Sequence, residues 1–129
     1  MALSYSTTVR NAMLDSITTA AGASALLKFY DGTRPATGGT VTNLLATLTC
    51  NATFAPASSG GVLTLNAITT ANASASGTST WARITTSGGT FVADLNVGTS
   101  GSDLNMTTNV FVSGSPVAVT SFVITEGNP

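Results

Sequence analysis

Alternation of apolar and polar residues is clearest on either side of a pair of glycines in the middle of the chain. Successive residues in 81–85 and in 91–97 point to opposite sides of an extended backbone, which is the period of a β-strand. Gly88 and Gly89 lie between these segments and can adopt the positive φ angles of a tight turn. The pattern predicts a β-hairpin over residues 77–97, with Trp81 and Arg83 on the same face.

The N-terminal segment follows the period of a helix instead. Val9, Met13, Ile17 and Ala20 or Ala21 recur at three- and four-residue spacing, as on the apolar stripe of an amphipathic helix. A hydroxyl at position 6 or 7 can cap the first turn and Gly22 can close the last, so the helix is expected over residues 6–22. The stripe packs either on the helix's own domain, which we favour, or on a neighbouring molecule as an arm.

Short apolar segments separated by Gly, Pro, Ser and Asn make up the rest of the chain. Their spacing of about 8 to 12 residues is typical of an all-β sandwich or barrel. The fold class predicted is mainly β, an antiparallel, jelly-roll-like β-sandwich of about eight strands with one N-terminal helix, as a single domain over residues 1–129. Strands beyond the hairpin are expected at 24–30, 41–54, 62–68, 104–112 and 117–125.

Three further expectations concern how these strands are arranged. Residues 41–54 and 62–68 are expected to form a second hairpin with a longer loop. Residues 104–112 are expected to be one strand with a bulge near Thr108 and Asn109. The β-branched run 117–125 is expected to lie centrally in a sheet.

Charge is scarce along the whole sequence. Charged residues make up 7% of the chain, against roughly 25% in ordinary soluble domains, and the formal net charge is −1. Without a basic cluster the chain is not expected to bind nucleic acid directly. Because interface cores are depleted in charge, the composition favours a chain covered by other subunits, including copies of itself, over a free hydroxyl-rich domain.

The sequence lacks the apolar segments of membrane-spanning and secreted proteins. No segment approaches the roughly 20 apolar residues that span a bilayer, and the N-terminus lacks the apolar core of a secretory signal. The expectation is a soluble protein made in the cytoplasm, without membrane contact. Cys50 is the only cysteine and lies in an apolar register, so it is predicted to be a buried, inert thiol.

Catalytic chemistry has few candidates in this sequence. The chain has no histidine, which removes the Ser-His-Asp and Cys-His nucleophile systems and His-ligated metal sites. Asp94 and Asp103 flank the 98–102 loop, where they can approach each other or bind calcium with loop carbonyls, although the region lacks the dense oxygen-ligand spacing of a calcium loop. We therefore predict no enzyme activity, no catalytic or metal-binding residues and no cofactor.

Four residues are candidates for a protein interface. Trp81 and Arg83 share a strand face, where they can anchor a partner or form a sugar-stacking platform if exposed, whereas core packing of Trp81 is the simpler interpretation. Arg34 and Pro35 lie in the glycine-containing segment RPATGGT, which is predicted to be an exposed contact loop.

Small virion proteins of tailed bacteriophages resemble this chain over nearly its whole length, in the order of the segments STTVRNAMLDSITTAAG, LLKFYDGTRP, LLATLTCNATFAPASSGGVLTLNAI, GTSTWARI and GTSGSDLN…FVITEGNP. The resemblance implies a structural protein, most like head decoration or cement proteins that lie on the capsid surface and bind the major capsid protein. The alternative is a tail-associated component, a fibre or spike, that binds a host glycan or receptor. The resemblance does not assign a functional role to any residue of this chain.

Overall fold

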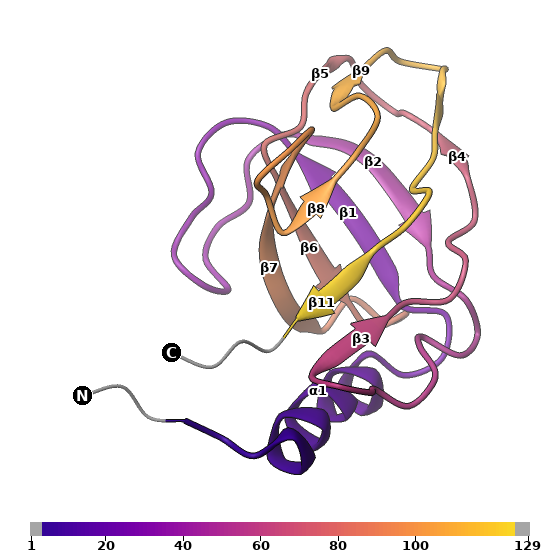
Figure 1. Ribbon diagram of the computed structural model, residues 1–129. Coiled ribbons are helices and arrows are strands. Elements are labelled where there is room, and N and C mark those ends of the chain that lie inside the picture. The colour runs from indigo at the N-terminus through magenta and orange to yellow at the C-terminus, as the bar shows by residue number, and fades with distance from the viewer. Residues whose placement is uncertain (1–3, 126–129) are drawn as a thin grey trace.

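The predicted hairpin is the centre of the sheet. The computed structural model describes residues 4–125, and in it β6 (Trp81–Thr85) pairs antiparallel with β7 (Phe91–Gly98) (Figure 1). Gly89 has a φ of 93°, so the turn uses the left-handed conformation that glycine allows. The hairpin prediction is confirmed, except that β6 begins at Trp81 and not at residue 77.

Three further strands extend the sheet on both sides of the hairpin. β1 (Leu26–Tyr30) pairs with β6, and β2 (Leu44–Thr49) pairs with β1 across a register shift between Phe29 and Tyr30. On the other side β8 (Leu104–Asn105) runs parallel to the end of β7. The strand order of this curled, five-stranded sheet is therefore β2-β1-β6-β7-β8.

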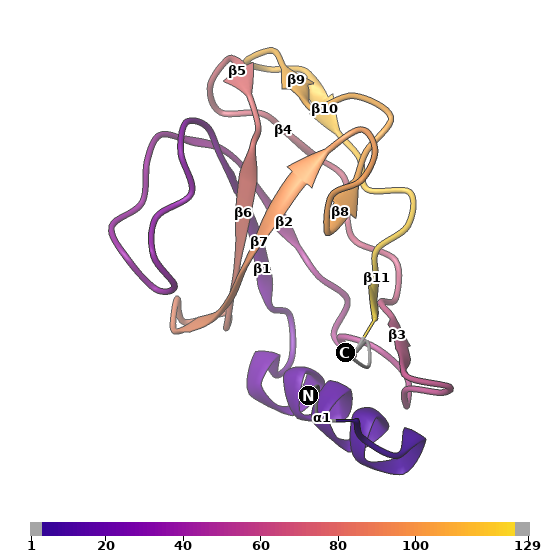
Figure 2. The ribbon, with the colours of Figure 1, turned by 60° about the vertical axis from the view of Figure 1, so that its left-hand side comes forward.

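Short two-stranded pairs lie opposite one side of this sheet (Figures 1 and 2). They are β3 (Val62–Thr64) with β11 (Val123–Thr125), β4 (Ala71–Asn72) with β10 (Pro116–Val117), and β5 (Gly77–Thr78) with β9 (Val110–Phe111). Core side chains join the two parts: the rings of Phe29 and Phe111 meet edge to face with centroids 5.3 Å apart. The chain is mainly β with one helix, as expected.

The helix α1 (Thr7–Ala21) closes one end of this arrangement (Figure 2). Its boundaries match the prediction, because the Ser6 side chain accepts a hydrogen bond from the Val9 amide and Gly22 ends the helix at a φ of 70°. The predicted packing stripe is only partly correct: Ile17 packs against the core and Ala21 is buried, but Val9 and Met13 are exposed. Leu14, which the stripe did not include, is also buried. No helix within residues 4–125 is long and apolar enough to cross a membrane.

Three predictions about strand arrangement are also wrong. β2 ends at Thr49 and pairs with β1, whereas β3 pairs with β11, so residues 41–68 do not form a hairpin. Residues 104–112 divide into β8 and β9, which belong to different sheets, and residues 117–125 contribute only to the peripheral strands β10 and β11. High β-propensity reflects how well a side chain fits a half-buried pleated surface, and it does not specify a central position.

Candidate functional site

The candidate interface residues Trp81 and Arg83 lie on the face of the sheet that points away from the core. Within β6 the alternate residues Ala82 and Ile84 are buried against the apolar core. Residues 31–43, which connect β1 to β2, project beside the opposite face as a long loop (Figure 2). The residues beneath this loop form the candidate site.

An ion pair between Arg83 and Asp94 occupies the middle of this face. These residues are direct cross-strand partners in β6 and β7. Arg83 donates from Nε to Asp94 Oδ1 at 2.7 Å and from Nη2 to Asp94 Oδ2 at 3.1 Å, and the Asp94 side chain has no exposed surface. A two-point contact of this kind fixes the orientation of both groups.

The same two side chains hold the tip of the 31–43 loop. Asp94 Oδ2 accepts a hydrogen bond from the Gly38 amide at 3.0 Å, and Arg83 Nη2 donates to the Gly39 carbonyl at 2.9 Å. A Cβ atom on Gly39 would lie 2.8 Å from the Ala36 carbonyl oxygen, so only glycine fits this tight loop without displacement. The ion pair is therefore a latch between sheet and loop, a role that the sequence pattern did not indicate.

Aromatic rings enclose the guanidinium of Arg83. Its Cζ lies 5.4 Å from the centroid of the Trp81 ring and 5.1 Å from that of Phe91, distances at which cation–π attraction operates. Trp81 also stacks on Tyr30, with centroids 4.5 Å apart. Its indole nitrogen donates to the Asp31 carbonyl oxygen at 3.1 Å and to Thr42 Oγ1 at 3.0 Å.

Trp81 is completely buried by these contacts. The expectation that it packs internally is confirmed. The alternative of an exposed platform built from Trp81 and Arg83 is inconsistent with the structure, because the loop covers both side chains and leaves 11% of the Arg83 side chain exposed. These two residues instead support the 31–43 loop through hydrogen bonds.

The surroundings of Arg83 and Asp94 favour the charged form of both side chains. Burial acts to raise the pKa of Asp94, but the hydrogen bonds from Arg83 and the Gly38 amide and the charges of Arg83 and Arg34 outweigh it, so the pKa lies below its usual value. The hydrogen bond to Asp94 raises the pKa of Arg83 further. Burial raises the pKa of Tyr30.

Arg34 and Pro35 lie in the loop itself and are half-buried. Arg34 donates from Nη1 to Asn96 Oδ1 at 3.2 Å and lies 4.0 Å from Asp103 Oδ2. A third of the Arg34 side chain is exposed. Arg34 and Pro35 are thus partly accessible to a partner, whereas Trp81 is buried and the Arg83 side chain is 11% exposed.

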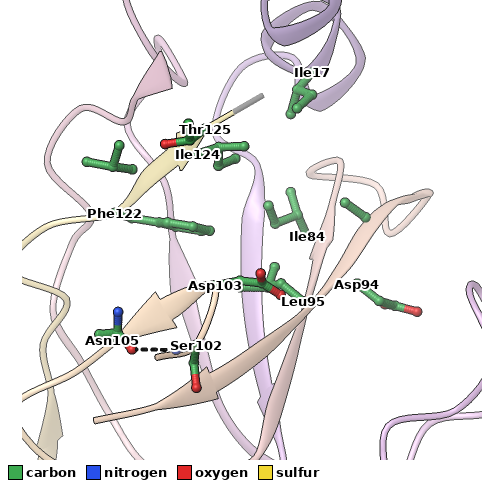
Figure 3. Close-up of a pocket in the computed structure, with 12 residues that line it drawn as sticks. Ile17, Ile84, Asp94, Leu95, Ser102, Asp103, Asn105, Phe122, Ile124 and Thr125 are labelled. Atoms are coloured by element: carbon green, nitrogen blue, oxygen red, sulfur yellow. Dashed lines mark hydrogen bonds between the residues drawn. The ribbon is translucent and has the colours of Figure 1, made fainter. Parts of the chain in front are cut away.

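A pocket of about 530 Å³ opens on the other face of the sheet, between β7 and β11 (Figure 3). Apolar side chains from α1, the sheet and β11 form much of its wall: Ile17, Ile84, Leu95, Phe122 and Ile124. Ser102, Asp103 and Asn105 contribute polar groups at one side. Such a mixture can accept a small amphiphilic group, but it presents no paired catalytic side chains.

Asp94 and Asp103 are not arranged as a carboxylate pair. The Asp94 side chain points away from the pocket, toward Arg83, while Asp103 accepts the Asn96 amide hydrogen at 2.8 Å (Figure 3). Within residues 4–125 no group of three or more His, Cys, Asp or Glu side chains is placed to hold a metal ion. Both carboxylates have structural partners.

Exposed charge is scarcer still than the composition indicates. Of the charged residues within 4–125, only Asp103 is exposed, with 58% of its side chain accessible. Arg10, Asp15, Lys28, Asp31, Arg34, Arg83 and Asp94 are all partly buried. The surface is consequently one of hydroxyl, amide and small apolar groups.

No family model matches the chain, and the comparisons with curated proteins and with solved structures found no significant similarity to any of them.

Proposed function

We propose that this chain is a non-enzymatic structural protein of a bacteriophage virion, a decoration or cement protein that lies on the capsid surface. It binds across boundaries between major capsid subunits and resists the internal pressure of packaged DNA. The observation that carries the proposal is the scarcity of exposed charge: every charged residue within 4–125 except Asp103 is partly buried. Such a surface loses little hydration when it is covered by other subunits.

The latched 31–43 loop is the contact element that we assign to the capsid. Its backbone is held by Arg83 and Asp94, so little conformational entropy remains to be lost on binding. Arg34 and Pro35 lie on its accessible part. Arg34 can exchange its weak, half-exposed contact with Asp103 for a carboxylate or carbonyl of the shell.

The rest of the fold serves as a rigid body in this proposal. We regard the five-stranded sheet and the short strand pairs opposite it as the two layers of a sandwich-like, jelly-roll-like domain. Contacts of about 800 Å² per partner, repeated around each molecule, lock neighbouring subunits by avidity, so no single contact needs to be strong.

The alternative function is a fibre or spike component that binds a host glycan. It relied on an exposed Trp81 beside Arg83, and the burial of Trp81 removes the aromatic platform. We therefore rank the capsid role first.

Particles lacking the protein test the proposal. They are expected to assemble but to release DNA at lower temperature, and added purified protein is expected to restore them. Arg34→Ala is expected to weaken this rescue, whereas Ser87→Ala, at an exposed site in the β6–β7 turn, serves as the control. Particles that are equally stable without the protein but unable to adsorb to host cells would place the chain in the tail.

A further inference from the structure

The two edges of the five-stranded sheet are not equally covered. The outer edge of β2 is covered by the chain around β4, where the Ser74 amide donates to the Leu45 carbonyl oxygen at 2.8 Å. On β7 the neighbouring strand β8 pairs only with Val97 and Gly98. Within residues 4–125, residues 91–96 therefore have β6 as their only strand partner, and their other side is an open edge.

Backbone groups of β7 point toward this open side. The Asn96 amide points outward, because it donates to Asp103 Oδ2 at 2.8 Å. The Gly98 carbonyl oxygen also points outward, because it accepts the Met106 amide hydrogen at 2.8 Å. Directions alternate from residue to residue in a strand, so the N–H and C=O groups of Asp94 face the same way. No strand in the described part of the chain pairs with them there.

The strand β11 presents a second open edge on the far side of the pocket described above (Figure 3). The Leu65 amide donates to the Phe122 carbonyl oxygen at 3.0 Å, so Phe122 turns its backbone toward β3. By the same alternation, Val123 and Thr125 turn their N–H and C=O groups away from β3, and both residues line the pocket. The pocket is therefore a slot with a backbone edge on each side and an apolar floor between them.

These features favour an extended polypeptide as the occupant of the slot. A strand offers N–H and C=O groups to the edges, and its alternate side chains reach the apolar floor, as when a strand is added to a sheet edge. The first six residues, MALSYS, have the matching pattern, because Met1, Leu3 and Tyr5 alternate with alanine and serine. Residues 1–3 precede the described part of the chain, and no charged side chain occurs before Arg10.

The start of α1 lies close to one end of the slot. Asn11 Oδ1 accepts the Gly61 amide hydrogen at 2.9 Å. The next residue, Val62, pairs with Thr125 at the end of β11. The chain that precedes α1 therefore begins beside the slot, and five extended residues span about 17 Å, enough to run along it. The β6–β7 turn lies at the same end of the sheet (Figure 2), so residues 1–5 entering from this end run antiparallel to β7.

We propose that residues 1–5, which we call the N-terminal arm, occupy the slot of their own molecule as an added strand antiparallel to β7. Leu3 lies over the apolar floor, and the backbone of the arm exchanges hydrogen bonds with Asp94. Because the arm is tethered beside the slot, its effective concentration is on the order of millimolar, and a weak contact suffices. The arm closes an edge that would otherwise pair with strands of other molecules. This inference concerns the isolated chain and does not depend on the capsid role.

Paramagnetic broadening of NMR signals tests the position of the arm in the full chain. Ser4→Cys places a nitroxide on the arm at a side chain that points away from the floor, while the buried Cys50 remains unlabelled. We expect strong broadening of the amide signals of residues 92–95 and 123–125. Adding Leu3→Asp is expected to remove most of it, because a carboxylate is excluded from an apolar floor. Broadening that is absent from the start, or unchanged by Leu3→Asp, would contradict the proposal.

A mixing experiment separates the molecule's own arm from that of a neighbour. Nitroxide-labelled Ser4→Cys without isotope labelling is added to isotope-labelled wild type, and only the wild-type signals are observed. The proposal requires the signals of residues 92–95 to stay sharp in this mixture. Broadening of these signals would assign the slot to the arm of a second copy and would overturn the proposal.

Hydrogen exchange provides a second readout that needs no nitroxide. The Asp94 amide is expected to exchange at least about tenfold more slowly in the wild type than in Leu3→Asp, because the arm supplies its acceptor. Ser4→Asp is the matched control: it adds the same charge at an exposed residue on the outward side of the arm, so the slow exchange is retained. Equal exchange of the Asp94 amide in the wild type and in Leu3→Asp would show that the arm does not pair with β7.

Discussion

Arg83 and Asp94 are direct cross-strand neighbours in β6 and β7 and are joined by hydrogen bonds of 2.7 and 3.1 Å. The same pair binds Gly38 and Gly39 of a loop more than forty residues away in sequence. The conformation of the 31–43 loop thus depends on a charge pair in the sheet, and the loop in turn excludes water from that pair.

Removing one partner of this pair should be strongly destabilising. Asp94→Asn leaves the Arg83 guanidinium, whose side chain is 11% exposed, without a compensating charge. We expect a loss of about 3 kcal/mol in the free energy of unfolding, measured by urea denaturation at neutral pH. Asp103→Asn is the control: its carboxylate is 58% exposed and its contact with Arg34 is 4.0 Å, so that ion pair contributes at most about 1 kcal/mol. Equal losses of unfolding free energy in Asp94→Asn and Asp103→Asn would argue against a role of the Arg83–Asp94 pair in holding the loop.

The contribution of Asp94 should depend on pH in a defined direction. Its pKa in the folded protein is lowered, so the folded state holds the charged form more strongly than the unfolded chain does. The stability that it contributes is complete above the unfolded pKa of about 3.9 and is lost as the pH falls through the lower folded value. The difference in unfolding free energy between wild type and Asp94→Asn is therefore expected to shrink below about pH 4. A difference that stays constant down to pH 2 would contradict this.

Trp81 provides a spectroscopic test of the covered site. It is the only tryptophan and is completely buried, so its fluorescence should be blue-shifted and poorly quenched by acrylamide. Trp81→Phe keeps a ring but removes the donor to Asp31 and Thr42, which should cost about 1–3 kcal/mol and increase hydrogen exchange in residues 31–43. Strong quenching in the native protein would mean that the loop does not cover the site.

Cys50 should be unreactive in the native protein. Burial raises the pKa of its thiol to about 11, so little thiolate forms at pH 8 and the sulfur is shielded. A thiol reagent such as DTNB is expected to react only after urea unfolds the chain, while Ser100→Cys, which places the thiol in an exposed loop, should react at once. Rapid native labelling of the wild type would contradict the buried position.

Local signals in the sequence identified the elements whose conformation depends on neighbouring residues. The boundaries of α1 follow from the cap at Ser6 and the left-handed Gly22, and the central hairpin follows from strand alternation around Gly88 and Gly89. The mainly β class and the exposed loop with Arg34 were predictable for the same reason. In each case the determining interactions lie within a few residues along the chain.

Only the tertiary structure decided which segments pair and which face each element buries. The run 117–125 has high β-propensity, yet it forms peripheral strands because β1, β2 and β7 already occupy the positions beside β6 and β1. Val9 and Met13 have helical spacing, but they are exposed and Leu14 is buried, because the side of α1 that carries Asn11 and Asp15 binds segment 58–61. Trp81 is covered because a distant loop is latched by Arg83 and Asp94. These outcomes depend on contacts between residues far apart in sequence, which periodicity and propensity do not encode.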